Sequence, residues 1–135
     1  MYGGLDISVS GMIAQRTRLN VIATNIANMD SVATPGGDAE PFRRKIALMT
    51  TGDPRKGEGS LGSHISAIID DTAPFNRKYE PGHELADKDG YVLYPNIDPV
   101  TEQISAVEAV RAYEANVAAA EATKALVAQA LRLIA

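Results

Sequence analysis

The sequence predicts an α+β fold: two long terminal helices form an antiparallel, coiled-coil-like unit, and a small β-rich domain is inserted between them. Three observations carry this prediction. The segment 96–135 contains no Gly and, beyond Pro99, no Pro. The segment 5–28 repeats apolar residues at heptad spacing. Between them, short apolar runs alternate with turn-forming Gly, Pro and Asp.

The C-terminal helix has a clear start signal. Asp98 can accept the free amides of the first turn, and Pro99 suits the first helical position, where its missing amide has no partner to lose. Strong helix formers, mainly Ala, Glu, Leu and Gln, dominate the interior. A helix of about 37 residues would extend roughly 55 Å, which is too long for one side of an ordinary small domain.

The apolar residues of this helix fall in two phases. The step of three between Val107 and Val110 is a stammer, which is predicted to overwind the coil locally. Glu and Arg interrupt every apolar window, so we expect no membrane span. The first phase comprises Ile97, Val100, Ile104 and Val107, and the second comprises Val110, Tyr113, Val117, Ala120, Val127, Leu131 and Ile134, with Lys124 at one core position.

The N-terminal helix is predicted over Leu5–Asn28. Asn28 suits the position after the helix, because Asn tolerates the left-handed conformation. Asn25 lies inside the helix and has two equally open interpretations: a solvent-facing residue, or an interhelical hydrogen bond that fixes the register. The apolar residues at heptad spacing are Leu5, Met12, Leu19 and Ile26, with Ile22 and Met29 at the matching positions.

The middle of the chain is predicted to be β-rich. Its candidate strands are 42–49, 61–70, 74–80 and 90–94, and residues 51–60 are predicted to form a flexible loop. The basic run Arg43-Arg44-Lys45 favours a solvated strand edge, with an acidic partner surface as the alternative. We therefore expect a helical assembly domain of residues 1–34 and 96–135, and an outer β-rich domain of residues 35–95.

Composition excludes several classes of function. The net charge of −4 argues against nucleic-acid binding, and the absence of Cys excludes disulfides and thiolate metal sites. The N-terminus has no basic segment followed by an apolar run, so we expect no cleavable secretory signal. Much of the apolar content is Ala and there are only 2 Phe and 0 Trp, so we expect the helices to complete their burial against other chains.

Motifs that would carry chemistry are incomplete. Residues 52–57 have the glycine spacing of a phosphate-binding loop, but Glu58 stands where Lys is required. Residues 85–90 are similar to part of a calcium loop, but Asn96 stands where a bidentate Glu is needed. The spacing of the two His favours no metal or acid–base site. We therefore expect no enzymatic activity, no cofactor and no metal.

Signature segments in three parts of the chain resemble a known family. The run Asn25-Ile26-Ala27-Asn28, followed by Asp30-Ser31, resembles the N-terminal signature of bacterial flagellar axial proteins. Residues 31–34 depart from that signature, since many axial proteins have Thr, then Gly or Pro, and an aromatic residue there. The stretch 79–98 and the segment Arg111–Asn116 resemble the C-type proximal rod proteins specifically. The resemblance covers nearly the whole chain.

The resemblance implies a structural subunit of the flagellar basal body. Such a protein would form part of the proximal rod, the drive shaft that transmits torque and encloses the export channel. It would assemble helically with other rod proteins and with itself, and would meet the export gate and the membrane rings. It would lie in the periplasmic space after export by the flagellar type III system, which uses no cleavable signal.

The physical interpretation of the helices agrees with this role. Contacts between different surfaces of neighbouring subunits that do not close a ring produce a helical filament, and such packing needs apolar seams left unsatisfied within one chain. A cytoplasmic helical adaptor or secretion chaperone is the alternative, although it would not need the β-rich insertion. The residues expected to pack between subunits are Leu5, Met12, Leu19, Ile22, Asn25, Ile26, Asn28, Ile104, Val107, Val110, Tyr113, Asn116, Val117, Ala120, Val127, Leu131 and Ile134.

Overall fold

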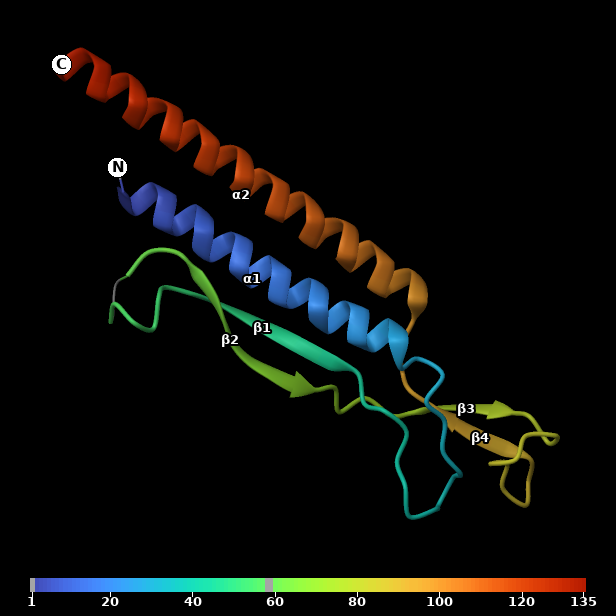
Figure 1. Ribbon diagram of the computed structural model, residues 1–135. Coiled ribbons are helices and arrows are strands. Elements are labelled where there is room, and N and C mark those ends of the chain that lie inside the picture. Colours follow the sequence, from blue (N-terminus) through green and yellow to red (C-terminus); the bar gives the residue numbers. More distant parts are fainter. Residues whose placement is uncertain (1, 58–59) are drawn as a thin grey trace.

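Two long helices lie side by side and antiparallel in the computed structural model, which describes residues 2–57 and 60–135 (Figure 1). The predicted α+β architecture with the strands inserted between the helices is confirmed. Residues 58–59, part of the predicted flexible loop 51–60 and of the incomplete phosphate-binding motif, lie outside the described residues. The elements are α1 (Tyr2–Ala27), β1 (Lys45–Thr51), β2 (Ser63–Asp70), β3 (Asn76–Tyr79), β4 (Tyr91–Tyr94) and α2 (Pro99–Ile134).

The start of α2 is the one predicted from the sequence. Asp98 has extended backbone angles, and its side chain accepts the amide of Val100 at 3.1 Å. The hydroxyl of Thr101 donates to the same carboxylate at 2.9 Å, and Pro99 occupies the first turn. The helix then continues through the predicted stammer to Ile134.

The end of α1 differs from the prediction for Asn28. No non-Gly residue among those described has a positive φ, so Asn28 does not adopt the left-handed conformation. Instead, its backbone amide and its side-chain Nδ2 both donate to the carbonyl of Thr24, at 3.1 and 2.8 Å. The Asn28 side chain thereby donates a hydrogen bond to one of the last carbonyls of the helix. In a left-handed cap, backbone amides beyond the helix end supply such bonds.

Small residues line the contact between α1 and α2. Ala14 of α1 and Ala109 and Ala120 of α2 are buried. A Cβ placed on Gly11 would lie 2.7 Å from the side-chain amide atoms of Asn116, so the helices approach closely at this point. A Cβ on Gly4 would lie 3.8 Å from Thr123, which puts the start of α1 opposite Thr123. The remainder of α2 extends beyond α1 (Figure 1).

The first apolar phase of α2 does not face α1. Val100, Ile104 and Val107 are 61%, 57% and 51% exposed and lie on the side of α2 away from α1. The second phase is only partly directed toward α1: Ala120 is buried and Val117 is half-buried, whereas Val110, Leu131 and Ile134 are exposed. The small residues of α2 allow a closer approach to Gly11 than Val or Ile would, and this selects the face that meets α1.

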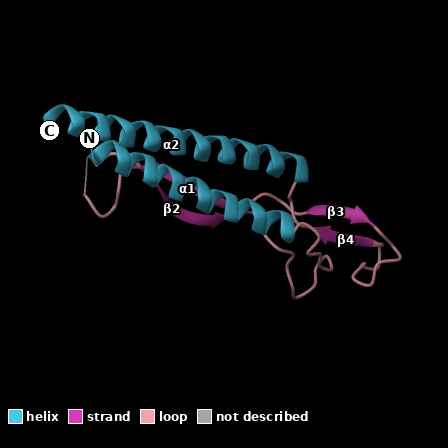
Figure 2. Cartoon of the chain, turned by 45° about the horizontal axis from the view of Figure 1, so that its top comes forward, coloured by secondary structure: helices cyan, strands magenta, loops and turns pink. Residues whose placement is uncertain are grey.

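The strands form two separate two-stranded antiparallel sheets. β1 pairs with β2 and carries a bulge between Leu48 and Met49, and β3 pairs with β4. Ala33 adds a single bridge to Leu93. The β1–β2 hairpin runs along α1, and Ser10 Oγ accepts the amide of Ser63 at 3.2 Å there. The β3–β4 ribbon lies beyond the end of α1 and the start of α2 (Figure 2).

The close approach at Gly11 is testable. We expect Gly11→Ala to lower the free energy of unfolding by about 1–3 kcal/mol, because the added methyl overlaps Asn116. Asn116→Ala should restore the stability of the double variant. Urea unfolding followed by far-ultraviolet circular dichroism measures both effects. Gly3→Ala is the matched control, since nothing lies within 4 Å of its Cβ position. Equal behaviour of the two Gly→Ala variants would contradict the close contact.

Candidate functional site

A buried polar junction lies where the end of α1 meets β1 and α2. Asn25 is 1% exposed. Its Nδ2 donates to the carbonyl of Lys45 at 2.9 Å, and its Oδ1 accepts the amide of Lys45 at 2.8 Å. Its Nδ2 also donates to Glu102 Oε2 at 3.4 Å. The interhelical hydrogen bond is therefore the correct interpretation of Asn25, and the solvent-facing one is wrong.

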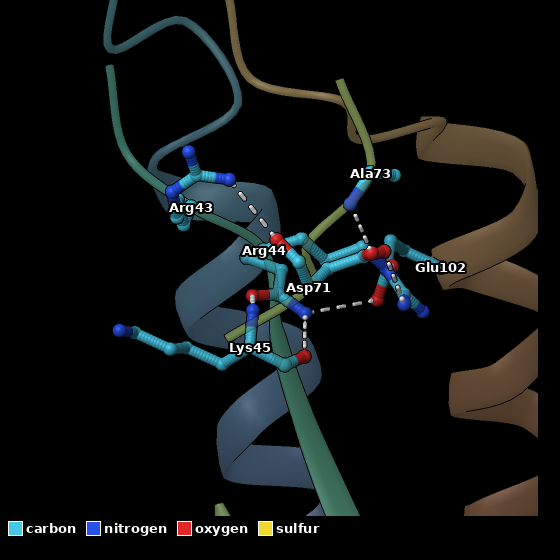
Figure 3. A network of polar contacts seen from close by, with 7 residues as sticks. Arg43, Arg44, Lys45, Asp71, Ala73 and Glu102 are labelled. Atoms are coloured by element: carbon cyan, nitrogen blue, oxygen red, sulfur yellow. Dashed lines mark hydrogen bonds and ion pairs between the residues drawn. The ribbon is translucent and has the colours of Figure 1, made fainter. Parts of the chain in front are cut away.

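Glu102 brings a charge into this junction. It lies in the first turn of α2 and is 1% exposed. Arg44 Nε donates to Glu102 Oε1, and Arg44 also forms an ion pair with Asp71 at 3.6 Å (Figure 3). The N-terminal end of the helix dipole further favours a carboxylate in this turn. The predicted solvated edge is wrong for Arg44, whose side chain is 26% exposed and paired with two acids.

Asp71 connects the end of the hairpin to the junction. Its amide donates to the carbonyl of Arg44 at 2.8 Å, and its carboxylate accepts the amide of Ala73 at 2.9 Å. Arg43 donates to the Asp71 carbonyl at 3.3 Å, and its guanidinium lies 4.4 Å from the ring centre of Phe75. Four segments distant in sequence thus converge on one set of hydrogen bonds (Figure 3).

The sequence interpretation missed Glu102, Arg44 and Asp71 as parts of one site. A signal for the inner face of α2 was present, since Glu102, Ala109, Asn116, Thr123 and Ala130 are spaced seven apart. This repeat of small and polar residues runs along the face that meets α1. The larger apolar residues of α2 form a stronger heptad pattern on other faces, which masks this repeat in the sequence.

An exposed apolar surface runs along the outer side of α2. We call it the outer stripe and define it as Val100, Ile104, Val107 and Val110. A groove of about 420 Å³ beside it is lined by Val100, Ile104 and Val107 together with Gln103, Glu108 and Arg111. Every residue of the outer stripe is more than two-fifths exposed. Apolar exposure of this extent on one helix is typical of a protein–protein contact.

The structure distributes the predicted subunit-packing residues over three environments. Those most accessible to a neighbouring chain lie on α2 alone. The buried residues are Ile22, Asn25 and Ala120; the half-buried ones are Leu5, Met12, Leu19, Ile26, Asn28, Asn116, Val117 and Val127; the exposed ones are Ile104, Val107, Val110, Tyr113, Leu131 and Ile134.

Aromatic and charged side chains hold the β3–β4 ribbon together. Tyr79 and Tyr91 make an edge contact with ring centres 5.4 Å apart, and Arg77 lies over Tyr91 at 4.7 Å. The Tyr94 hydroxyl donates to Glu80 at 2.9 Å. This hydrogen bond, together with burial, raises the pKa of Tyr94 above its ordinary value. The ribbon therefore has its own side-chain interactions apart from the helices.

The described residues were also compared with what a metal site and a membrane-spanning helix require. Within residues 2–57 and 60–135, no three His, Asp or Glu side chains gather as metal ligands would. Of the two carboxylates in the stretch 85–90, that of Asp87 is engaged locally, because it accepts the amides of Asp89 and Tyr91. Neither helix, over its described length, has a stretch apolar enough to pass through a lipid bilayer.

The junction makes a specific prediction about Asn25. Asn25→Asp should lower the free energy of unfolding by about 3 kcal/mol, because a carboxylate cannot donate and would face both Glu102 and the Lys45 carbonyl. Asn20→Asp, on the exposed side of the same helix, should change it by less than about 0.5 kcal/mol. Urea titration compares the two variants, and similar losses would contradict the role of the junction.

Comparisons with known proteins agree with this architecture. A family model described as flagella basal body rod protein matches residues 5–35. The flagellar basal-body rod protein FlgC of Salmonella typhimurium is 39% identical over 128 residues, covering 95% of this chain and 93% of the relative. FlgC of Yersinia enterocolitica is 41% identical over 129 residues, covering 95% and 93%. FlgC of Bacillus subtilis is 36% identical over 145 residues, covering 98% and 97%. The chain therefore belongs to the FlgC family of flagellar basal-body rod proteins.

Proposed function

We propose that this chain, a structural rod subunit of the flagellar basal body, forms part of the proximal rod. There it transmits torque and encloses the export channel. The names of its relatives describe rod proteins, which supports a structural role over an enzymatic one and over a cytoplasmic adaptor or chaperone. The single observation that carries the proposal is the outer stripe, a large apolar surface of α2 that α1 does not cover.

The outer stripe gives α2 two packing surfaces. Its small-residue face meets α1 through Ala109 and Ala120, while Ile104 and Val107 on the other side remain exposed. A helix that is apolar on opposite sides is suited to burial between two neighbours. We therefore assign the second neighbour of α2 to another rod subunit, so that the exposed packing residues predicted from the sequence become buried on assembly.

The order of layers supports the proposed division into domains. α1 lies between α2 and the β1–β2 hairpin, so α2 and the hairpin occupy opposite sides of the molecule (Figure 1). A tube built from such units can place both helices in its inner wall and the strands outward, with the outer stripe against a helix of a neighbouring subunit. In this arrangement residues 1–34 and 96–135 form the rod core, and residues 35–95 form the outer surface.

The remaining parts of the proposal concern assembly and location. The subunit assembles helically with copies of itself and with other rod proteins, and the ends of the proximal rod meet the export gate and the membrane rings. It reaches the periplasmic space through the flagellar type III system. Recovery of the chain in purified basal bodies, with a resolved map of the proximal rod, tests this location. Recovery only from the cytosol would favour the adaptor.

The outer stripe can be tested by placing a charge in it. Ile104→Asp or Val107→Asp should abolish swimming and remove assembled rods, because an unpaired charge would enter the packed layer. Both residues are more than half exposed, so the free subunit should keep its helix content. Soft-agar motility, electron microscopy of basal bodies and circular dichroism measure these effects.

Ile104→Leu is the matched control for this experiment. It keeps an apolar side chain of the same size at the same position, so cells carrying it should swim normally. Normal basal bodies in cells that carry both Asp substitutions would show that the outer stripe is not a subunit contact.

A further inference from the structure

The C-terminal part of α2 has no partner helix within the described chain. Thr123 lies opposite Gly4, two residues after the start of α1, so most of residues 124–134 extend beyond α1 (Figure 1). We call residues 124–134 the overhang. It carries large apolar side chains in exposed positions: Leu126 and Leu131 are each 62% exposed, and Leu133 and Ile134 are 82% and 83% exposed.

The overhang continues an interface that already exists. Asn116 and Thr123 face α1, and Ala130 follows Thr123 at the same spacing of seven. Val127, between them on this face, is only half-buried. This face of α2 therefore continues the surface that packs against α1 into a region that α1 does not reach. In the overhang the same face has no helix packed against it within the described chain.

A groove of matching character lies elsewhere on the chain. It has a volume of about 430 Å³ and runs between α1 and β2. Two of its lining residues, Ile13 of α1 and Ile68 of β2, are 61% and 52% exposed. Its walls are mainly apolar. The lining includes Ile13, Ala14 and Thr17 of α1, Ile65, Ala67 and Ile68 of β2, and also Asp53, Arg55 and His64.

We infer that the overhang of one copy packs into the groove between α1 and β2 of a second copy. This inference rests on the proposed function and specifies one of its subunit contacts. Leu126 and Leu133 lie on one side of the overhang, while Val127, Leu131 and Ile134 lie on another. A segment that is apolar on two sides needs a groove with two walls. The helix and the sheet supply them, whereas the groove beside the outer stripe has lining residues from α2 alone.

The occupant must come from another chain. Gly11 faces Asn116, so Ile13 and Leu131 of the same chain are separated by more than about 20 Å along the helices. The overhang and the groove are different surfaces of the chain. Repeated contacts between two different surfaces that do not close into a ring extend a filament head to tail. The charged residues of the overhang are Lys124 and Arg132, and the groove lining carries one carboxylate, Asp53, and one guanidinium, Arg55, so the pairing rests on the apolar surfaces.

Disulfide trapping tests this contact, because the chain has 0 Cys. The test variant carries Ile13→Cys and Leu131→Cys, both at exposed positions, and a second test variant pairs Ile68→Cys with Leu131→Cys. A disulfide needs Cα atoms within about 7 Å, so neither pair can close inside one chain. Oxidation of basal bodies from swimming cells should give a ladder of disulfide-linked oligomers at multiples of the chain mass.

Ile104→Cys with Leu131→Cys is the matched control, since it directs the overhang to the outer stripe. A ladder from either test variant, without one from the control, supports the inference. A ladder from the control alone, or a cross-link to a protein of different mass, overturns it. Absence of cross-links in basal bodies that contain normal amounts of the chain also overturns it and leaves the proposed function standing. Absence of the unmodified chain from basal bodies would instead refute the proposed function.

Discussion

The buried contact of Glu102 with Arg44 and Asn25 is the constraint on which the rest of the structure depends. A carboxylate that is 1% exposed can remain charged only if partners replace its water, and these partners come from the end of α1 and the residue before β1. Because Glu102 lies in the first turn of α2, the contact fixes where α2 starts relative to the end of α1. The axial register of the two helices follows from this one junction.

That register determines which face of α2 is used within the chain. With Glu102 held at Asn25, Asn116 meets Gly11 and Thr123 meets Gly4. The inner face therefore includes small and polar residues that allow close approach, and the large apolar residues Val100, Ile104 and Val107 are directed to the outer side. The close approach of the two helices at Gly11 leaves large apolar residues of α2 exposed. The two helices are therefore closely packed, while large apolar side chains of α2 remain exposed on the surface of the subunit.

The same junction organises the strands. Asn25 binds the backbone of Lys45 as a neighbouring strand would, and Asp71 holds the end of β2 against Arg44. The hairpin is thus held along α1, on the side away from α2. One polar cluster therefore sets the order of layers, with α1 between α2 and the β1–β2 hairpin.

Local signals were sufficient to predict much of this protein from its sequence. The two helices, the Asp98–Pro99 start, the approximate positions of four strands and the resemblance to rod proteins all depend on neighbouring residues, and the structure and comparisons confirm them. Only the tertiary structure decided the role of Asn25, the pairing of Arg44 and the face of α2 that meets α1. The size and apolarity of the side chains suggested a seam through Ile104. How closely two helices approach, however, depends on the side chains of both facing surfaces, here Gly11 of α1 and Asn116 of α2. Gly11 and Asn116 are 105 positions apart, so their contact is absent from any local pattern.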